Sequence, residues 1–276
     1  MKSKYILLES KQIKENIYKD ITNYLKKHPY KKSLDIIFIG DNSASKHYIE
    51  IKTKKAKELG IKTNVHNFTN ESDEIEIKNK IIKLNNDSKV GGIIVQLPII
   101  KSFNTSEIID TITPEKDVDK MTSYNLGKTY ISQKLNNNSC TAQAVLQLIN
   151  FYNINVKSLN VLIVGNTIVV GKPLAAILTN MQATVTIANR HTFNLRDHLK
   201  NSDMVISATG MKNIIKGKDI KKGAILFDIG FTKEGDKSHG DLEFESCKKK
   251  ASMITPHIGG VGPLTVANIF LNLLDI

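Results

Sequence analysis

Short apolar runs alternate with amphipathic segments along most of this 276-residue chain, and this alternation constrains its fold. In the first half, strands are predicted at 34–39, which is a short apolar run, and at 63–68 and 90–95, whereas helices are predicted at 44–59 and 74–84. Strands that are separated by helices of this length run parallel, because each crossover helix returns the chain to the same end of the sheet. The chain is therefore predicted to be an α/β protein built from βαβ units.

A helix predicted at 141–152 leads into the second half, where strands and helices alternate again. Near the start of the chain, a further helix is predicted at 9–27. Gly60 is expected to end the helix 44–59, because glycine readily adopts the backbone conformation needed there. The seam between the two halves is expected near residues 138–142, after the polar stretch Asn136–Asn138. The further strands expected are 160–165, 184–188, 204–207 and 224–228, and the further helices are 171–179 and 266–274.

The composition restricts the class of protein. Hydrophobic residues make up 41% of the chain, which is enough for a substantial core. No apolar run is long enough to span a membrane, and the first residues lack the apolar stretch of a signal peptide. The two cysteines, Cys140 and Cys247, provide neither a disulfide framework nor a zinc-binding spacing. We therefore expect a cytoplasmic protein with no bound metal and no membrane partner.

The formal net charge of +12 indicates a surface that attracts anions. Surfaces that bind nucleic acid usually cluster lysine and arginine on one face, with aromatic residues between them. Here the lysines are spread over the predicted helices, arginine is scarce and tryptophan is absent. Anionic small molecules are therefore the expected partners rather than nucleic acid, although a lysine-rich composition alone would give the same charge.

A glycine loop at 164–173 follows one predicted strand and precedes one predicted helix. Gly165 would allow a tight turn, and Gly171 would allow the helix to start close to a phosphate group. The loop is not a P-loop, because Pro173 stands where that motif needs serine or threonine. A strand, a glycine turn and a helix in this order predict a dinucleotide-binding site.

The segment 189–192 follows the next predicted strand. Enzymes that use NAD usually place a carboxylate at this point, where it binds the ribose hydroxyls. The segment has no carboxylate, and Arg190 instead predicts a site for the 2′-phosphate of NADP. The alternative is a solvent-exposed arginine at the end of a strand.

Two positions in the first half are candidates for catalysis. Tyr48 and Lys52 lie four residues apart on the helix predicted at 44–59, so they share one face. Lys52 is a candidate catalytic residue, although most lysines on helices are solvated and this helix carries several. Gln96 stands at the carboxyl end of a predicted strand, where open α/β sheets bind their ligands.

Two loops are further candidates. The segment 114–119 contains two aspartates, which either bind a ligand or form a turn and a helix cap. The segment Ile254–Thr265 contains three glycines and two prolines, so it is neither an ordinary helix nor an ordinary strand. We expect it to present backbone N–H groups to an anionic or planar ligand, with Thr265 capping the helix that follows, and a plain turn is the alternative.

Taken together, these segments resemble one enzyme family, the methylenetetrahydrofolate dehydrogenase/cyclohydrolases, which are the FolD-type folate enzymes. The resemblance runs along nearly the whole chain and depends on several motifs in the expected order. The motifs are Ser45-Lys46-His47-Tyr48 with Lys52, Gln96-Leu97-Pro98, Lys116-Asp117-Val118-Asp119, Cys140-Thr141, Val170-Gly171-Lys172-Pro173-Leu174, Asp228-Ile229-Gly230, Gly240-Asp241 and Gly259-Gly260-Val261-Gly262-Pro263.

The resemblance implies two domains and two reactions. Residues 1–139 would form a folate-binding catalytic domain that the C-terminal helix 264–276 joins. Residues 140–263 would form a Rossmann-like NADP-binding domain, through which two copies would form a homodimer. The enzyme would oxidise 5,10-methylenetetrahydrofolate to the 5,10-methenyl cation with NADP⁺. It would then hydrolyse this cation to 10-formyltetrahydrofolate, a product of one-carbon metabolism that purine biosynthesis uses.

The resemblance also implies roles for individual residues. Lys52 would be the catalytic lysine of the hydrolysis, Gln96 would position Lys52, and Tyr48 would contact the folate. A lysine that acts as a base near neutral pH needs a lowered pKa, and Gln96 can bind the amine without adding a negative charge. The other substrate-binding residues implied are Leu97, Pro98, Asp119, Gly259, Gly260 and Pro263. The cofactor-binding residues implied are Gly165, Asn166, Thr167, Val170, Gly171, Lys172, Pro173, Arg190, Thr209, Gly210, Ile229 and Gly230.

Several positions depart from the family pattern. Asn166-Thr167 replaces the family's Arg-Ser, and Asn189-Arg190 replaces its His-Ser. Either one basic residue has moved across the phosphate site, or the cofactor preference has changed. A shikimate-dehydrogenase-like enzyme and a non-catalytic protein that binds nucleotide or nucleic acid remain the alternatives. The departures near the expected folate pocket are Ile100, Lys120, Ser139 and His257-Ile258.

Overall fold

The computed structural model describes residues 5–100, 102–131, 138–234 and 237–276. It divides into two compact units. The three-strand unit consists of Asn16–Lys128 with Val266–Ile276, and the six-strand unit consists of Met1–Glu15 with Thr129–Thr265. Residues 136 and 137 of the polar stretch before the predicted seam, and the first four residues of the chain, lie outside the described residues. The domain boundaries expected after residues 139 and 263 remain predictions.

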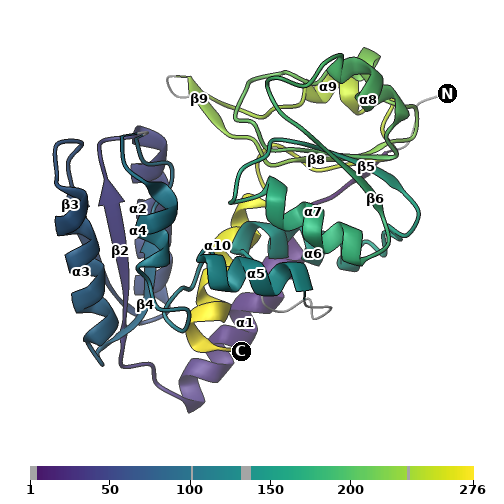
Figure 1. Ribbon diagram of the computed structural model, residues 1–276. Coiled ribbons are helices and arrows are strands. Elements are labelled where there is room, and N and C mark those ends of the chain that lie inside the picture. The colour runs from purple at the N-terminus through teal and green to yellow at the C-terminus, as the bar shows by residue number, and fades with distance from the viewer. Residues whose placement is uncertain (1–4, 101, 132–137, 235–236) are drawn as a thin grey trace. The chain divides into compact units, whose positions relative to one another are not determined.

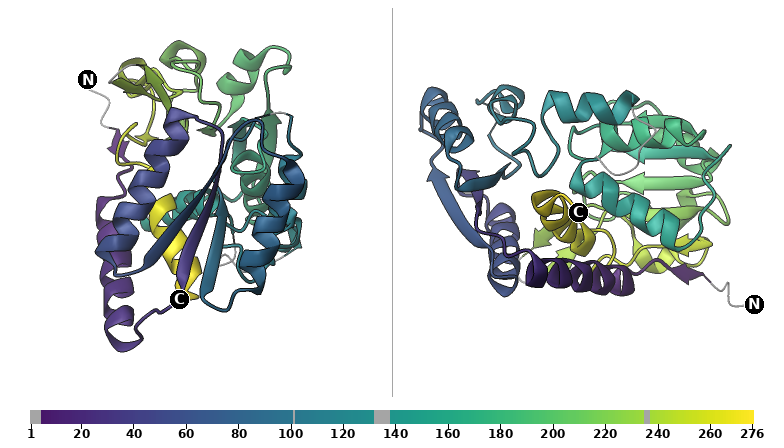
Figure 2. Two further views of the ribbon diagram at one scale, coloured as in Figure 1. Left: turned by 90° about the vertical axis from the view of Figure 1, so that its left-hand side faces the viewer. Right: turned by 90° about the horizontal axis from the view of Figure 1, so that it is seen from below.

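In the three-strand unit, β2 (Ser33–Ile39) lies between β3 (Lys62–Phe68) and β4 (Val90–Val95), and all three strands run parallel. The helix α2 (Ser43–Glu58) connects β2 to β3, and α3 (Glu74–Asn86) leads from β3 back to β4. Because these two connections travel in opposite directions along the sheet, right-handed crossovers place helices on both of its faces (Figure 2). The parallel βαβ units predicted for this half are confirmed.

The local signals of this half also behave as expected. Every residue of β2 is buried, as is typical of a central strand that is covered on both faces. Asn42 caps the start of α2 by accepting a 2.9 Å hydrogen bond from the backbone N–H of Ser45. Gly60 follows the end of α2 with a φ of +71°, so its predicted role in ending the helix is confirmed.

The chain passes between the two units within helices. These are α1 (Lys11–Lys27), α5 (Ser123–Ile131) and α10 (Gly262–Leu274). Near the end of α10, Nδ2 of Asn272 donates a 2.8 Å hydrogen bond to the carbonyl oxygen of Val118. This bond ties the closing helix to the segment that follows β4 in the three-strand unit.

The start of α10 differs from the prediction. The helix begins at Gly262, so Thr265 lies within its first turn. The Thr265 hydroxyl donates a 3.4 Å hydrogen bond to the carbonyl oxygen of Val261, and the predicted helix cap at Thr265 is therefore wrong. Pro263 explains the earlier start, because its fixed φ suits the first helical turn and its missing N–H is not needed there.

The six-strand unit contains one parallel sheet in the order β1-β11-β8-β7-β5-β6, of which Figure 1 labels β8, β5 and β6. From β5 the chain runs through α7 to β6 at the edge, and it then returns through α8 to β7 on the other side of β5. These opposite directions place α7 and α8 on opposite faces of the sheet, as Figure 1 shows. The arrangement is doubly wound, and the predicted α/β class is confirmed.

The remaining elements are these. The strands are β1 (Ile6–Leu7), β5 (Asn160–Val164), β6 (Thr184–Ala188), β7 (Met204–Ser207), β8 (Ile225–Asp228) and β11 (Met253–Ile254), with a hairpin of β9 (Thr232–Glu234) and β10 (Lys237–His239). The helices are α4 (Thr105–Asp110), α6 (Cys140–Phe151), α7 (Gly171–Asn180), α8 (Leu195–Asn201), α9 (Phe244–Cys247) and a 3₁₀ turn at Gly217–Asp219. Across the described residues, every helix is too short or too polar to cross a membrane.

One row of apolar side chains fixes the register of the six-strand sheet. Leu162, Val205, Leu226 and Ile254 pair with one another in that order across four adjacent strands, and all four are fully buried. A slip of one residue in any strand would turn its side chain to the other face, so burial of this row holds the strands in place. The carboxyl ends of these strands consequently lie at one level, and the loops that follow them meet there.

Candidate active-site residues

The structure brings Lys52 and Gln96 together in the three-strand unit. The strand order changes direction beside β2, so the carboxyl ends of β2 and β4 flank the position where open α/β sheets bind ligands. Gln96 directly follows β4, and Lys52 comes from the helix that follows β2. The Nζ of Lys52 donates a 2.8 Å hydrogen bond to Oε1 of Gln96, and the two residues are only 6% and 7% exposed.

The backbone and a neighbouring carbonyl hold the Gln96 amide in place. The backbone N–H of Gln96 donates a 2.9 Å hydrogen bond to the carbonyl oxygen of Ile37 in β2. The side-chain Nε2 of Gln96 donates a 2.8 Å hydrogen bond to the carbonyl oxygen of Leu97. The Ser45 hydroxyl donates to the same carbonyl at 3.3 Å, and the Leu97–Pro98 peptide bond is cis. Because the amide nitrogen is committed to Leu97, the amide oxygen remains for the lysine.

Tyr48 lies one helical turn before Lys52 and is half-buried. Burial raises the pKa of the Tyr48 hydroxyl above its usual value. The phenol therefore stays protonated at neutral pH and can donate a hydrogen bond to a ligand.

The two aspartates of segment 114–119 differ in their surroundings. Asp117 is 1% exposed and accepts hydrogen bonds from the Thr122 N–H at 2.8 Å and from Nδ2 of Asn125 at 2.9 Å, so it organises the turn before α5. The backbone of Asp117 also pairs in parallel with Ile93 of β4. After Asp117 the chain enters a turn that contains half-buried Asp119, and the Lys120 N–H donates to the carbonyl oxygen of Asp117 at 3.4 Å.

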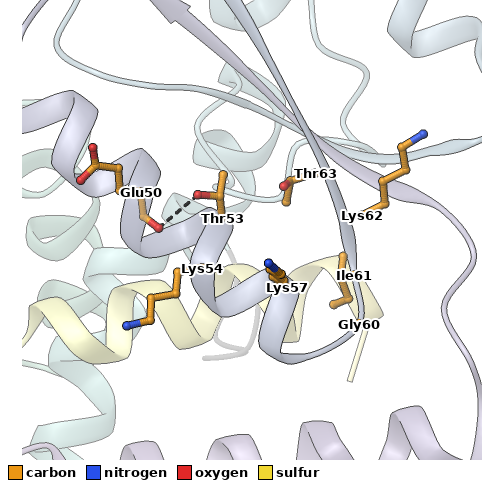
Figure 3. A pocket seen from close by; sticks show the side chains of 8 residues that line it. All are labelled: Glu50, Thr53, Lys54, Lys57, Gly60, Ile61, Lys62 and Thr63. Carbon is orange, nitrogen blue, oxygen red and sulfur yellow. Dashed lines mark hydrogen bonds between the residues drawn. The ribbon is translucent and has the colours of Figure 1, made fainter.

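The other side of α2 carries a separate hollow (Figure 3). Its volume is about 770 Å³, and it lies between α2 and the start of β3. The residues that line it do not include Tyr48, Lys52 or Gln96, so the described part of α2 presents a buried lysine on one side and solvated lysines on the other. The lining residues are Glu50, Thr53, Lys54, Lys57, Gly60, Ile61, Lys62 and Thr63.

In the six-strand unit, the glycine loop forms a tight turn between β5 and α7. Gly165 has a φ of +124°, and a Cβ there would lie 2.6 Å from the carbonyl oxygen of Ala208. A Cβ on Gly171 would lie 1.9 Å from the carbonyl oxygen of Gly165. Thr167 braces the turn by accepting hydrogen bonds from the N–H groups of Val170 and Lys172 at 3.3 and 3.0 Å. A tight turn with a glycine at each end, before a helix N-terminus and beside the point where strand order reverses, fits a dinucleotide diphosphate.

Arg190 stands beside this turn, since β6 pairs directly with β5. The segment that follows β6 is folded back on itself: the Asn189 N–H donates to the Thr192 hydroxyl and the His191 N–H donates to Oδ1 of Asn189, both at 2.8 Å. The Nε of Arg190 donates to Nε2 of His191 at 3.1 Å, and both side chains are exposed. His191, which the sequence argument did not single out, thus adds a second basic side chain at this edge.

Two buried carboxylates shape the loops after β7 and β8. Asp241 is fully buried and accepts hydrogen bonds of 2.7 Å from the Ser207 hydroxyl and the Thr209 N–H. Asp228 accepts a 2.9 Å bond from the Asp241 N–H. A Cβ on Gly230 would lie 1.8 Å from Asp241, so the loop packs directly on this carboxylate. Burial, more than the nearby Asp241 charge, raises the pKa of Asp228 to about 7.

The loop before α10 is tied to the N-terminal segment of the same unit. Ser10 donates two hydrogen bonds to the carbonyl oxygen of Gly259, from its N–H at 2.9 Å and from its hydroxyl at 2.7 Å. Gly259 has a φ of +90°, and a Cβ on Gly260 would lie 2.7 Å from the carbonyl oxygen of Pro256. The expected shaped loop is confirmed in its backbone conformation, which side chains at these glycines would strain or block.

Comparison with known proteins assigns both halves of the chain. A family model described as tetrahydrofolate dehydrogenase/cyclohydrolase, catalytic domain, matches residues 8–119. The companion model, tetrahydrofolate dehydrogenase/cyclohydrolase, NAD(P)-binding domain, matches residues 139–276. The "Bifunctional protein FolD" of a Nitratiruptor species is 39% identical over 264 residues, which are 95% of this chain and 93% of that relative.

Solved structures agree with these matches. The bifunctional FolD enzyme from Campylobacter jejuni has a TM-score of 0.90 at 32% sequence identity, covering 99% of this chain and 98% of its own. The FolD enzyme of Trypanosoma brucei, solved in complex with NADP cofactor and inhibitor, also has a TM-score of 0.90, at 28% identity. That likeness covers 98% of this chain and 96% of the Trypanosoma brucei chain.

Proposed function

The chain belongs to the tetrahydrofolate dehydrogenase/cyclohydrolase family, and we propose that it performs both of the family's reactions with NADP⁺ as its preferred cofactor. It oxidises 5,10-methylenetetrahydrofolate to the 5,10-methenyl cation and hydrolyses that cation to 10-formyltetrahydrofolate. The observation that carries the proposal is the buried hydrogen bond between Lys52 and Gln96 at the ligand-binding end of the sheet. The shikimate-dehydrogenase-like alternative loses its basis, because both family models are folate models.

Lys52 serves as the base of the hydrolysis. A water molecule forms a bond to the methenyl carbon and gives a proton to the Lys52 amine, the bond between that carbon and N5 then breaks, and one proton is released overall. The amine must be neutral to accept the proton. Burial disfavours a charged amine, and the uncharged amide of Gln96 orients Nζ without adding a negative charge.

The folate is proposed to contact residues of the same unit as this pair, and we assign Tyr48, Leu97, Pro98 and Asp119 to folate binding. The loop Gly259–Pro263 is assigned to folate binding from the family's motif alone. Tyr48 can donate from its protonated hydroxyl, and half-buried Asp119 can accept from the N–H groups of a pterin ring. Each assignment carries over the family's motif at that position, and Leu97 and Pro98 also lie just after the end of β4.

The glycine turn from Gly165 to Pro173 holds the diphosphate of the cofactor, and the loops 209–210 and 229–230 hold its nicotinamide half. When bound, the cofactor accepts the hydride from the methylene carbon, and the protein's task is to hold the two reacting carbons together. Arg190 binds the 2′-phosphate with the help of His191. Two basic side chains without a neighbouring carboxylate in segment 189–192 support NADP over NAD.

We also propose that two copies pair through the six-strand unit. β6 lies at one edge of that sheet and leaves a row of backbone groups for another strand. Ile187 on this strand is 39% exposed, and Phe193 beyond it is 90% exposed. Pairing of two β6 edges would cover both residues.

The test is the substitution Lys52→Met, with Lys54→Met as its matched control. Lys54 is an exposed lysine on the same helix. Loss of a general base slows a reaction by about 10² to 10⁴-fold, so Lys52→Met should accumulate the methenyl cation while keeping part of the dehydrogenase activity. Lys54→Met should keep both activities. Hydrolysis by Lys52→Met at the rate of the control would remove Lys52 from the mechanism.

A further inference from the structure

His257 occupies the loop after β11, where it packs against Phe231. β11 pairs with β8, so the segments that follow these two strands are neighbours. The imidazole of His257 and the ring of Phe231 are stacked, with centroids 6.0 Å apart and planes inclined by 20°. The phenyl ring therefore restrains the imidazole at the carboxyl edge of the sheet, among the loops proposed to hold the nicotinamide half of the cofactor.

Both ring nitrogens of His257 are buried, and neither has a hydrogen-bond partner among the described residues. A buried polar atom without a partner costs free energy, so such atoms in a protein usually face a ligand or water. Burial lowers the pKa of the imidazole, nearby His239 lowers it further and Asp241 acts in the opposite direction. A neutral imidazole offers one donor and one acceptor.

The direction of the bound cofactor follows from the sheet. The diphosphate lies at the turn after β5, and the adenosine ribose lies at the end of β6 on one side. The other half of the dinucleotide must then extend over the ends of β7, β8 and β11, where His257 stands. The nicotinamide ring of that half carries a carboxamide, whose acceptor oxygen or donor nitrogen can pair with one nitrogen of a neutral imidazole.

We propose that His257 binds the carboxamide of the nicotinamide ring and thereby sets the orientation of that ring. The proposal rests on the proposed function, since it presupposes that the six-strand unit binds NADP. His257 acts in it as a positioning residue for the hydride transfer.

Two probes separate this role from a purely structural one. NADPH contains the carboxamide, whereas adenosine 2′,5′-bisphosphate contains only the adenine half with its 2′-phosphate. Both would be titrated calorimetrically into the intact wild-type enzyme and into His257→Val and His257→Gln. The control is His198→Ala, which removes an exposed histidine from α8 in the same unit.

Loss of the hydrogen bond to the carboxamide should raise the Kd for NADPH by up to about tenfold in His257→Val and change the Kd for the bisphosphate less than about twofold. The amide of His257→Gln again provides a donor and an acceptor, so this variant should recover most of the affinity for NADPH. It also carries the test if His257→Val fails to fold.

Either of two results would overturn the inference. One is an unchanged Kd for NADPH in His257→Val, which would mean that the imidazole nitrogens hydrogen-bond to water and not to the carboxamide. The other is an equal loss of affinity for both probes, which would mean that the loop has merely been disturbed. Failure of wild-type enzyme to bind either probe would instead reject the proposed function itself.

Discussion

Replacing Gly171 with alanine places a methyl group where the structure has no room for one. The new Cβ would lie 1.9 Å from the carbonyl oxygen of Gly165, whereas real Cβ atoms essentially never come closer than 3.0 Å to another heavy atom. The turn would have to open by about 1.1 Å, and the obstacle is backbone rather than a flexible side chain. Overpacking of this kind costs about 1–3 kcal/mol. The displaced backbone is the part proposed to hold the cofactor diphosphate.

We therefore expect Gly171→Ala to raise the Kd for NADPH by at least about tenfold, which corresponds to about 1.4 kcal/mol. The Tm should fall by several degrees. Hydrolysis of supplied methenyltetrahydrofolate should continue in protein that remains folded, because Lys52 and Gln96 belong to the three-strand unit and the hydrolysis consumes no cofactor. Calorimetric titration, thermal unfolding and loss of methenyl absorbance measure these three quantities.

Gly127→Ala is the matched control. Gly127 lies within α5, and nothing stands within 4 Å of a Cβ placed there. Alanine at this position should stabilise the helix by about 1 kcal/mol and leave cofactor binding unchanged. If Gly171→Ala bound NADPH with wild-type affinity and melted at the wild-type temperature, the turn would not be the rigid cradle described above.

Three further predictions concern charge and titration. Arg190→Ala should weaken NADP binding about 10 to 100-fold and NAD binding less than about twofold, and equal effects on both cofactors would contradict the assignment of Arg190. Asp228 has a folded-state pKa of about 7, above its usual 3.8, so the folded protein keeps a proton that the unfolded chain releases. Its contribution to the free energy of unfolding should therefore fall as the pH rises from about 4 to about 7 and stay constant above that, and a pH-independent difference between wild type and Asp228→Asn would refute this. Burial raises the pKa of the Cys247 thiol to about 12, so a thiol reagent at pH 8 should label Cys247 only after unfolding, and rapid labelling of folded protein would show that it is accessible.

The periodicity of the sequence was sufficient to predict the main strands and helices. The strands at 184–188 and 204–207 agree with β6 and β7 to the residue, because each is a short apolar run between turn residues. Strand β1 escaped prediction, since two residues carry no periodic signal and Ile6–Leu7 become a strand only by pairing with Met253–Ile254 at the far end of the chain. The start of α10 was missed because Thr265 looked like a cap, whereas Pro263 allowed the helix to begin earlier.

The candidate site was predictable only in part. Lys52 and Gln96 are 44 residues apart, and the order of the strands, rather than their spacing, brings them within 2.8 Å. The sequence identified His257 only as a departure from the family pattern. That both of its nitrogens are buried and unpartnered depends on the packing of Phe231 and the surrounding loops, which no local pattern reveals. The hydrogen bond from the Thr209 N–H to the Asp241 carboxylate joins residues that are 32 positions apart, so it could not be predicted from a local pattern either.

The most direct test of the central claim is turnover of 5,10-methylenetetrahydrofolate by the purified chain, with NADP⁺ and NAD⁺ assayed side by side. Reduced cofactor, the methenyl cation and the 10-formyl product would be followed together. The account predicts faster reduction of NADP⁺ than of NAD⁺, with release of 10-formyltetrahydrofolate. Turnover with NAD⁺ alone would contradict the role given to Arg190, and a folded protein that turned over with neither cofactor would contradict the proposed function as a whole.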